Sequence, residues 1–203
     1  MSSVVSRFAV DLIAVGLAGV AIKLMDDHLD YEADISQGQP SLVRALGGGA
    51  VLYSLVFALI GCAMNLRLAC PLVLAAYVVG MLKNPGDMLP LGLSAWMESA
   101  VVALVTCLLF GWRLALVSVL LMTVVQLADD LRDFASDRAA GRANLARRLG
   151  KGEAFLLCLI ALLGALVVDK RTTFLVCLCA PAIEVASRLV PGCRGGGADA
   201  DVD

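Results

Sequence analysis

The chain has 203 residues, of which 60% are hydrophobic and 17% are charged, and its mean hydropathy is +0.88. Soluble domains are about 45–50% apolar, so this composition excludes an ordinary water-soluble globule and indicates a protein that lies in a lipid bilayer. A net charge of −2 and an aromatic content of 5% also exclude a nucleic-acid-binding protein, which would need a basic surface.

Apolar windows follow one another along the chain, each bounded by charged residues, Gly or Pro. The seven windows are residues 8–25, 48–66, 68–83, 88–110, 112–128, 153–168 and 172–190. A helix rises about 1.5 Å per residue, so each window can cross most of a ~30 Å hydrocarbon layer. The sequence therefore predicts an all-α, polytopic membrane protein with about seven transmembrane helices in a single domain, residues 1–190. Residues 191–203, rich in Gly and Asp, are predicted to be a disordered tail.

The connections between these windows differ in length and charge. Three are short and predict helical hairpins, at residues 66–67, 84–87 and 111–113. Residues 26–47 and 129–152 form two much longer connections that contain most of the charge. We therefore expect the functional site in the two long connections.

Lys and Arg residues are distributed unequally between the two ends of the windows. With the amino terminus outside, eleven of the sixteen fall on the cytoplasmic side and five on the other side. Because cytoplasmic segments carry an excess of Lys and Arg, this distribution predicts that both long acidic connections lie on the cytoplasmic face of the cell membrane.

Both long connections begin with the same acidic pattern. Residues 26–34 read DDHLDYEAD and residues 129–137 read DDLRDFASD, so both follow D-D-x-x-D-x-x-x-D, and they contain eight of the fourteen Asp residues. On a helix that turns about 100° per residue, the second, third and fourth Asp of the pattern share one face. The two predicted carboxylate stripes are Asp27, Asp30 and Asp34, and Asp130, Asp133 and Asp137.

A stripe of carboxylates at a membrane boundary needs a cation, because like charges repel and lose solvation there. Oxygen ligands suit Mg²⁺, which takes one or two carboxylates together with phosphate oxygens of a substrate. Two stripes facing each other would hold a diphosphate between metal ions. The alternative, that the carboxylates only mark the membrane boundary, is weaker for a repeated motif than for a single one.

Polar side chains that could bind the phosphates lie near the acidic motifs. They are Lys83, Arg138, Arg142, Arg147 and Arg148. Guanidinium groups match phosphate geometry, although basic residues here could instead serve only to set the topology. Gln126 lies one turn before Asp130 on nearly the same face, so it could contact a metal-bound water or the substrate. A hydrogen bond between helices is an equally good interpretation of Gln126.

The two motifs resemble those of the UbiA superfamily of intramembrane prenyltransferases. The segment from Asp130 to Gly150 is similar to the family pattern D-x-x-D-x-x-x-D-R-x-x-G-K-x-T-L-x-x-x-L-G, and residues 26–34 resemble N-D-x-x-D-x-x-x-D with Asp26 in place of Asn. Tyr77 and Lys83 resemble a Tyr and a Lys that end the corresponding family helix near the diphosphate. The resemblance covers roughly residues 10–190.

The resemblance implies a helical bundle around a central cavity open to the lipid. It further implies Mg²⁺-dependent transfer of a prenyl group from a polyprenyl diphosphate to a small lipophilic acceptor, commonly an aromatic ring. Asp27, Asp30, Asp130 and Asp133 would be catalytic and, with Asp34 and Asp137, would bind the metal. Substrate contacts would come from Tyr77, Lys83, Arg138 and Arg142. Because the family usually has about nine helices, one wall of the cavity would be missing or supplied by another subunit of a homo-oligomer.

Two other functions stay open at this point. A terpene cyclase would use the same ionisation of a prenyl diphosphate without an acceptor. An ion or proton carrier would explain the acidic residues inside apolar windows, Asp11, Glu98 and Glu184. A CDP-alcohol phosphotransferase is excluded, because its motif begins with Asp-Gly and the chain contains no such pair.

Overall fold

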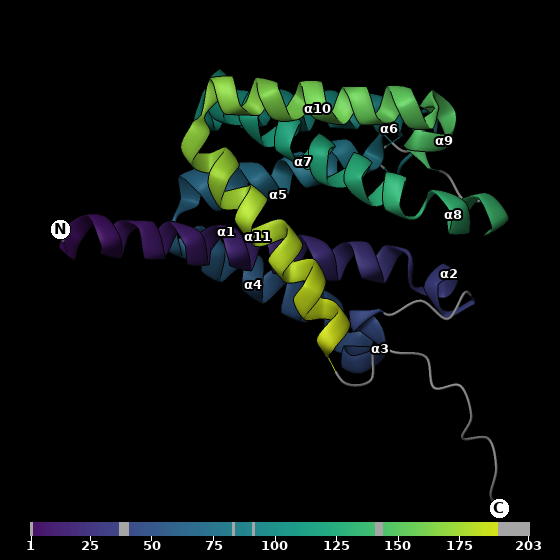
Figure 1. Ribbon diagram of the computed structural model, residues 1–203, viewed down its shortest axis with the longest axis horizontal. Helices are drawn as coiled ribbons and strands as arrows, with labels where there is room; N and C mark the ends of the chain where they lie inside the picture. The colour runs from purple at the N-terminus through teal and green to yellow at the C-terminus, as the bar shows by residue number, and fades with distance from the viewer. Residues whose placement is uncertain (1, 37–40, 83, 91, 141–143, 191–203) are drawn as a thin grey trace, which may run out of the picture. The chain divides into compact units, whose positions relative to one another are not determined.

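The computed structural model describes residues 2–36, 41–82, 84–90, 92–140 and 144–190, and the regular elements in these ranges are helices (Figure 1). In chain order they are α1 (Ser2–Leu29), α2 (Tyr31–Ser36), α3 (Leu42–Leu46), the 3-10 turn η1 (Gly47–Gly49), α4 (Ala50–Met64), α5 (Leu66–Met81), α6 (Ala95–Phe110), α7 (Trp112–Arg132), α8 (Phe134–Ala140), α9 (Leu145–Leu149), α10 (Lys151–Val168) and α11 (Lys170–Leu189). Lys83, Arg142 and the predicted tail 191–203 lie outside the described residues, as does the side chain of Asp34.

Among the described residues, five helical segments are long and apolar enough to cross a membrane. They are Val5–Leu29, Leu42–Met64, Trp112–Arg132, Lys151–Val168 and Lys170–Leu189. The shorter apolar helices α5 and α6 occupy two more of the predicted windows. Large apolar side chains point outward along these helices, as Leu108 (77% exposed) and Val167 (83% exposed) show. Such a surface is stable in lipid rather than in water, so the expectation of an all-helical integral membrane protein is confirmed at this level.

One predicted window is wrong at its start. Residues 88–110 were expected to form one helix, but α6 begins only at Ala95. The preceding residues form a loop in which the Leu89 amide donates to the Leu93 carbonyl over 2.9 Å. The sequence around Pro85 and Pro90 prevents an earlier start, because proline lacks the amide hydrogen that a helix interior requires.

The chain divides into two compact units, of which the first comprises residues 1–65 and 177–203. Within it α1 packs along α4, and the contact depends on small side chains. A Cβ added at Gly61 would lie 3.1 Å from the Ala14 carbonyl oxygen and 3.4 Å from the Ala18 nitrogen. Ala14 and Ala18 are completely buried, so the two backbones approach closely, as is usual where helices associate in lipid.

The second unit comprises residues 66–176, and α7 is its centre. This helix packs against α5, α6 and α10, and its residues Val117, Leu121 and Leu127 are fully buried. Leu127 also forms an apolar cluster with Ala146 of α9 and Ala154 of α10. The cluster fixes the short helix α9 against the end of α7 that carries the second acidic motif.

Candidate functional site

Each acidic motif spans a break in its helix rather than one continuous helix. α1 ends at Leu29 and α2 begins at Tyr31, so Asp30 lies between them; in the same way Asp133 lies between α7 and α8. Asp133 has φ −92° and ψ 9°, outside the helical range, although its amide still donates to the Asp129 carbonyl over 2.9 Å. The predicted stripe on a single continuous helix is therefore wrong. Acidic side chains at a helix C-terminus oppose the helix dipole, which favours ending the helix here.

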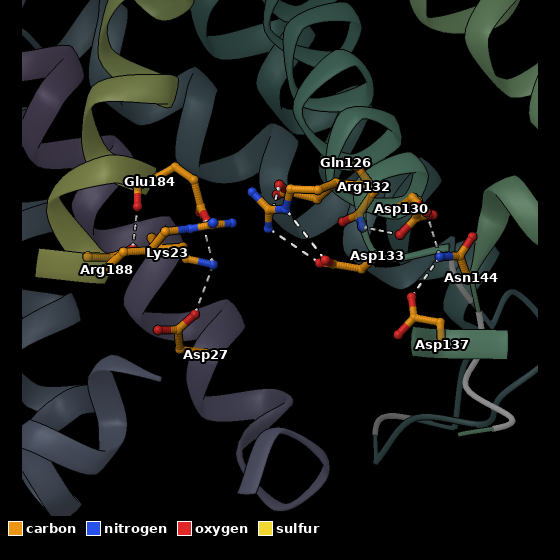
Figure 2. A network of polar contacts seen from close by, with 12 residues as sticks. Lys23, Asp27, Gln126, Asp130, Arg132, Asp133, Asp137, Asn144, Glu184 and Arg188 are labelled. Atoms are coloured by element: carbon orange, nitrogen blue, oxygen red, sulfur yellow. Dashed lines mark hydrogen bonds and ion pairs between the residues drawn. The ribbon is translucent and has the colours of Figure 1, made fainter. Parts of the chain in front are cut away.

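In the first motif, Asp27 is buried and its two carboxylate oxygens have different partners, of which Figure 2 shows Lys23. Lys23, one turn earlier on α1, places its Nζ 3.0 Å from Oδ1, while the backbone amide of Leu42 donates to Oδ2 over 2.8 Å. Leu42 is the first residue of α3, where a helix leaves amide hydrogens without partners of its own. Asp27 thus fixes the chain that returns after the motif.

Lys23 also connects this carboxylate to the C-terminal helix. Its Nζ lies 3.5 Å from Glu184 Oε2, and Arg188 Nε donates to Glu184 Oε1 over 3.0 Å (Figure 2). The exposed fraction of the Lys23 and Glu184 side chains is about one fifth, 21% and 23%, so the pair is shielded from water. The first motif is therefore held by a charge network that joins α1 to α11.

In the second motif, Asp130 has the same arrangement. Gln126 Nε2, one turn earlier on α7, donates to Oδ1 over 3.1 Å, and the backbone amide of Leu145 donates to Oδ2 over 2.7 Å. Leu145 is the first residue of α9. The partner of Gln126 is thus the carboxylate one turn further along its own helix (Figure 2).

Asn144 forms hydrogen bonds with two Asp residues of the second motif, Asp130 and Asp137. It is buried, and its Nδ2 donates to the Asp130 carbonyl over 2.8 Å and to Asp137 Oδ2 over 2.7 Å. Its Oδ1 accepts from the Arg147 amide over 3.0 Å and so caps α9. Asp130 and Asp137 are therefore brought together in the protein interior.

Asp133 lies apart from these two buried carboxylates. The guanidinium of Arg132 is 3.3 Å from Asp133 Oδ2 and also 3.3 Å from Asp129 Oδ1. All three side chains are about one third exposed. Two carboxylates at the end of α7 thus share the partly exposed guanidinium of Arg132.

The other predicted substrate residues have varied surroundings. The Tyr77 hydroxyl donates to Glu98 Oε2 over 2.6 Å, from α5 to α6. Arg138 is exposed on α8. Arg148 of α9 donates to Asn84 Oδ1 over 3.3 Å, from the segment after the second motif to the loop after α5.

A metal ion would find carboxylates but no complete ligand set. In the described parts of the chain, no three His, Cys, Asp or Glu side chains lie together in a way that could hold a metal. Asp129 and Asp133 form the pair that fits Mg²⁺ best, because their oxygens already share one cation and Mg²⁺ usually takes only one or two protein carboxylates.

The similarity between the two motifs extends further than the acidic residues. Residues 26–49 align with residues 129–152 without a gap, and ten of the 24 positions are identical. The identical pairs are Asp26/Asp129, Asp27/Asp130, Asp30/Asp133, Asp34/Asp137, Gly38/Gly141, Leu42/Leu145, Arg44/Arg147, Leu46/Leu149, Gly47/Gly150 and Gly49/Gly152. Both short helices end at a glycine with positive φ, 57° at Gly47 and 103° at Gly150. The described parts of the two segments therefore match: an apolar helix ends within each motif, and a short helix that ends at a glycine follows.

Sequence reasoning missed the residues that support the motifs. Lys23 and Asn144 were not selected and Glu184 was considered only for a carrier, although each makes a polar contact with a motif residue or with its partner. The alignment contains a signal for one of them, because Lys23 and Gln126 both lie four residues before the second Asp of their motif.

Compared with known proteins, the chain matches no protein-family model, no curated protein and no solved structure. The resemblance to the UbiA superfamily thus depends on the motifs alone and stays a prediction.

Proposed function

We propose that the protein is a Mg²⁺-dependent intramembrane prenyltransferase that transfers a prenyl group from a polyprenyl diphosphate to a small lipophilic acceptor. The observation that carries this proposal is the repeated acidic motif, which lies at the end of two apolar helices and has the same local geometry in both copies. Carboxylates that cluster at a membrane boundary repel one another and lose solvation, so a cationic or metal-bound ligand is the best reason for the repeated cluster.

Mg²⁺ would be held by the carboxylates that lie nearer the surface. These are Asp129 and Asp133 in the second motif and, by the alignment of the two copies, Asp26 and Asp30 in the first. Bound Mg²⁺ would stabilise the negative charge that develops on the departing diphosphate. Metal binding by Asp27, Asp34, Asp130 and Asp137 stays a prediction from the resemblance.

Residues of the chain would bind the phosphates and exclude water from the reaction. Arg138 is exposed beside the second motif, and Arg148 reaches Asn84 from α9, so cationic groups are available to bind phosphate oxygens. The apolar helices would surround the prenyl chain and exclude water, which would otherwise react with an allylic carbocation.

Calorimetry with geranylgeranyl diphosphate tests the proposal on the full chain in detergent micelles. We expect binding with Mg²⁺ and much weaker binding with EDTA. Asp30→Asn and Asp133→Asn should weaken binding, whereas Asp87→Asn, an exposed carboxylate in the loop before α6, should not. Equal affinity with Mg²⁺ and with EDTA would contradict a metal-dependent site.

Turnover distinguishes a transferase from a cyclase. Release of diphosphate that requires a lipophilic acceptor supports transfer, and release with the donor alone supports cyclisation. Because one ionisation step produces both diphosphate and product, the two should fall together in Asp133→Asn. A protein that binds the donor but releases no diphosphate with any acceptor, or alone, would be a binding protein rather than an enzyme.

A further inference from the structure

Asp27 and Asp130 have a contact pattern that distinguishes them from the other motif carboxylates. In each, one oxygen accepts from a side chain four residues earlier and the other accepts from a backbone amide fifteen residues later. We refer to this arrangement as a loop anchor. The same pattern occurs in two separate units of the chain, so it is a property of the repeated sequence and not an accident of one site.

Burial separates the two anchors from the first and third Asp of the second motif. Asp27 is 4% exposed and Asp130 is 5% exposed, whereas the Asp129 and Asp133 side chains are about one third exposed at 34% and 35%. A buried carboxylate that accepts on both oxygens already has its charge compensated, so it gains less from a metal than a carboxylate nearer the surface does. The carboxylates of Asp129 and Asp133 lie nearer the surface, and Arg132, which they share, is itself partly exposed.

We propose that Asp27 and Asp130 are positioning residues, which hold the chain returning after each acidic motif so that the more exposed carboxylates face the substrate. This inference rests on the proposed function, because it assigns positioning and metal binding to different carboxylates of the same motifs. The second Asp of D-D-x-x-D-x-x-x-D is then an acceptor for the first amide of α3 or α9, and the first and third Asp are the groups that meet the metal.

The two anchors differ in one respect that can be used as a test. Gln126 can rotate its amide and present an oxygen, so Asp130→Asn can keep both hydrogen bonds: the new Oδ1 accepts from Leu145 and the new Nδ2 donates to Gln126. Lys23 has no acceptor, so Asp27→Asn leaves an ammonium opposite an amide. We therefore expect Asp130→Asn to lower the stability of the protein less than Asp27→Asn does.

Hydrogen exchange at the Leu145 amide, measured on the full chain in detergent micelles, reports on the second anchor directly. Asp130→Ala should accelerate this exchange by about tenfold or more, because the amide loses a charged acceptor. Asp130→Asn should stay within about threefold of the unaltered protein, since one oxygen still accepts. The matched control is Asp133→Asn, three residues away, which should leave the Leu145 amide unchanged.

Binding of Mn²⁺ with inorganic diphosphate, followed by the electron paramagnetic resonance of free Mn²⁺, supplies the second readout. We expect Asp133→Asn to weaken binding by about tenfold and Asp130→Asn by less than about threefold, because only the former removes a charge next to the metal. In the first copy, Lys23→Gln should keep the Leu42 amide protected, because it recreates the side chain that Gln126 supplies to Asp130.

Two results would overturn the inference. One is an unchanged Leu145 exchange rate in Asp130→Ala. The other is a loss of Mn²⁺ binding in Asp130→Asn as large as in Asp133→Asn while the Leu145 amide stays protected, which would make Asp130 a metal ligand. If the unaltered protein binds neither Mn²⁺ nor diphosphate, the proposed function fails, and hydrogen exchange alone then decides whether the anchors exist.

Discussion

Replacement of Asn144 by Ala should destabilise the second unit more than any single change at its surface. The side chain is 2% exposed and makes three hydrogen bonds: to the Asp130 carbonyl, to Asp137 Oδ2 and from the Arg147 amide. Loss of the helix cap costs about 1 kcal/mol. Loss of a donor to a buried carboxylate and to a buried carbonyl adds about 2 kcal/mol, so the expected total is about 3 kcal/mol.

The measurement is the free energy of unfolding in mixed detergent micelles, followed by far-ultraviolet circular dichroism as dodecyl sulfate is added. Asn144→Ser is the matched control, because Ser41 occupies the N-cap position of α3 in the first copy and Ser is a preferred N-cap residue in general. Asn144→Ser should lower the free energy of unfolding less than Asn144→Ala does. Asn144→Asp keeps the shape of the side chain but places another carboxylate 2.7 Å from Asp137. Its free energy of unfolding should therefore fall the most of the three variants.

A change of less than about 0.5 kcal/mol in Asn144→Ala would refute this reasoning, since that is the usual effect of a surface substitution. The same conclusion would follow if Asn144→Asp were more stable than the unaltered protein, because Asp137 would then not depend on a donor from this position.

Two further predictions concern topology and packing. Cysteines introduced at Met88 and Ala135, both exposed, should react with an impermeant maleimide from the same, cytoplasmic side, and one at Lys170 from the other; reaction of the first two from opposite sides would contradict the proposed topology. Gly61→Ala should destabilise the protein by about 1–2 kcal/mol, because its Cβ would lie 3.1 Å from the Ala14 carbonyl. Gly80→Ala, which meets nothing within 4 Å on α5, should be neutral or stabilising by up to about 1 kcal/mol, and an equal loss at both glycines would disprove the close α1–α4 contact.

The helical fold was predictable because lipid imposes a simple rule on the sequence. A segment that crosses hydrocarbon must be apolar over its whole length, so the windows are visible without knowledge of the packing. The short connections were predicted for the same reason, and Asn65 and Gly111 each separate two helices by a single residue. The start of α6 at Ala95 was not predicted, because Met88 and Leu89 are as apolar as the helix itself. Pro85 and Pro90 interrupt the helical backbone there, which hydropathy does not show.

The interior of the candidate site was less predictable. The spacing of Asp27, Asp30 and Asp34 predicts one face only if the helix continues, and the break at Asp30 depends on backbone contacts that spacing does not reveal. The partner of Asp27 is the amide of Leu42, and every residue except Pro has such an amide, so residue type gives no signal. Only the repetition of the pattern at a constant distance could have indicated an anchor.

Acidic residues inside membrane helices usually mark a path for ions or protons, and three of them initially supported a carrier. The structure gives each one a neighbour on another segment: Asn65 donates to Asp11 over 2.7 Å, Tyr77 donates to Glu98 over 2.6 Å, and Lys23 lies 3.5 Å from Glu184. These pairs join α1 to the end of α4, α5 to α6, and α1 to α11. A role in holding helices together is therefore sufficient to explain the three acidic residues. These contacts remove the observation that supported a carrier, and binding of a diphosphate stays the proposal that the repeated motifs at the ends of α1 and α7 support.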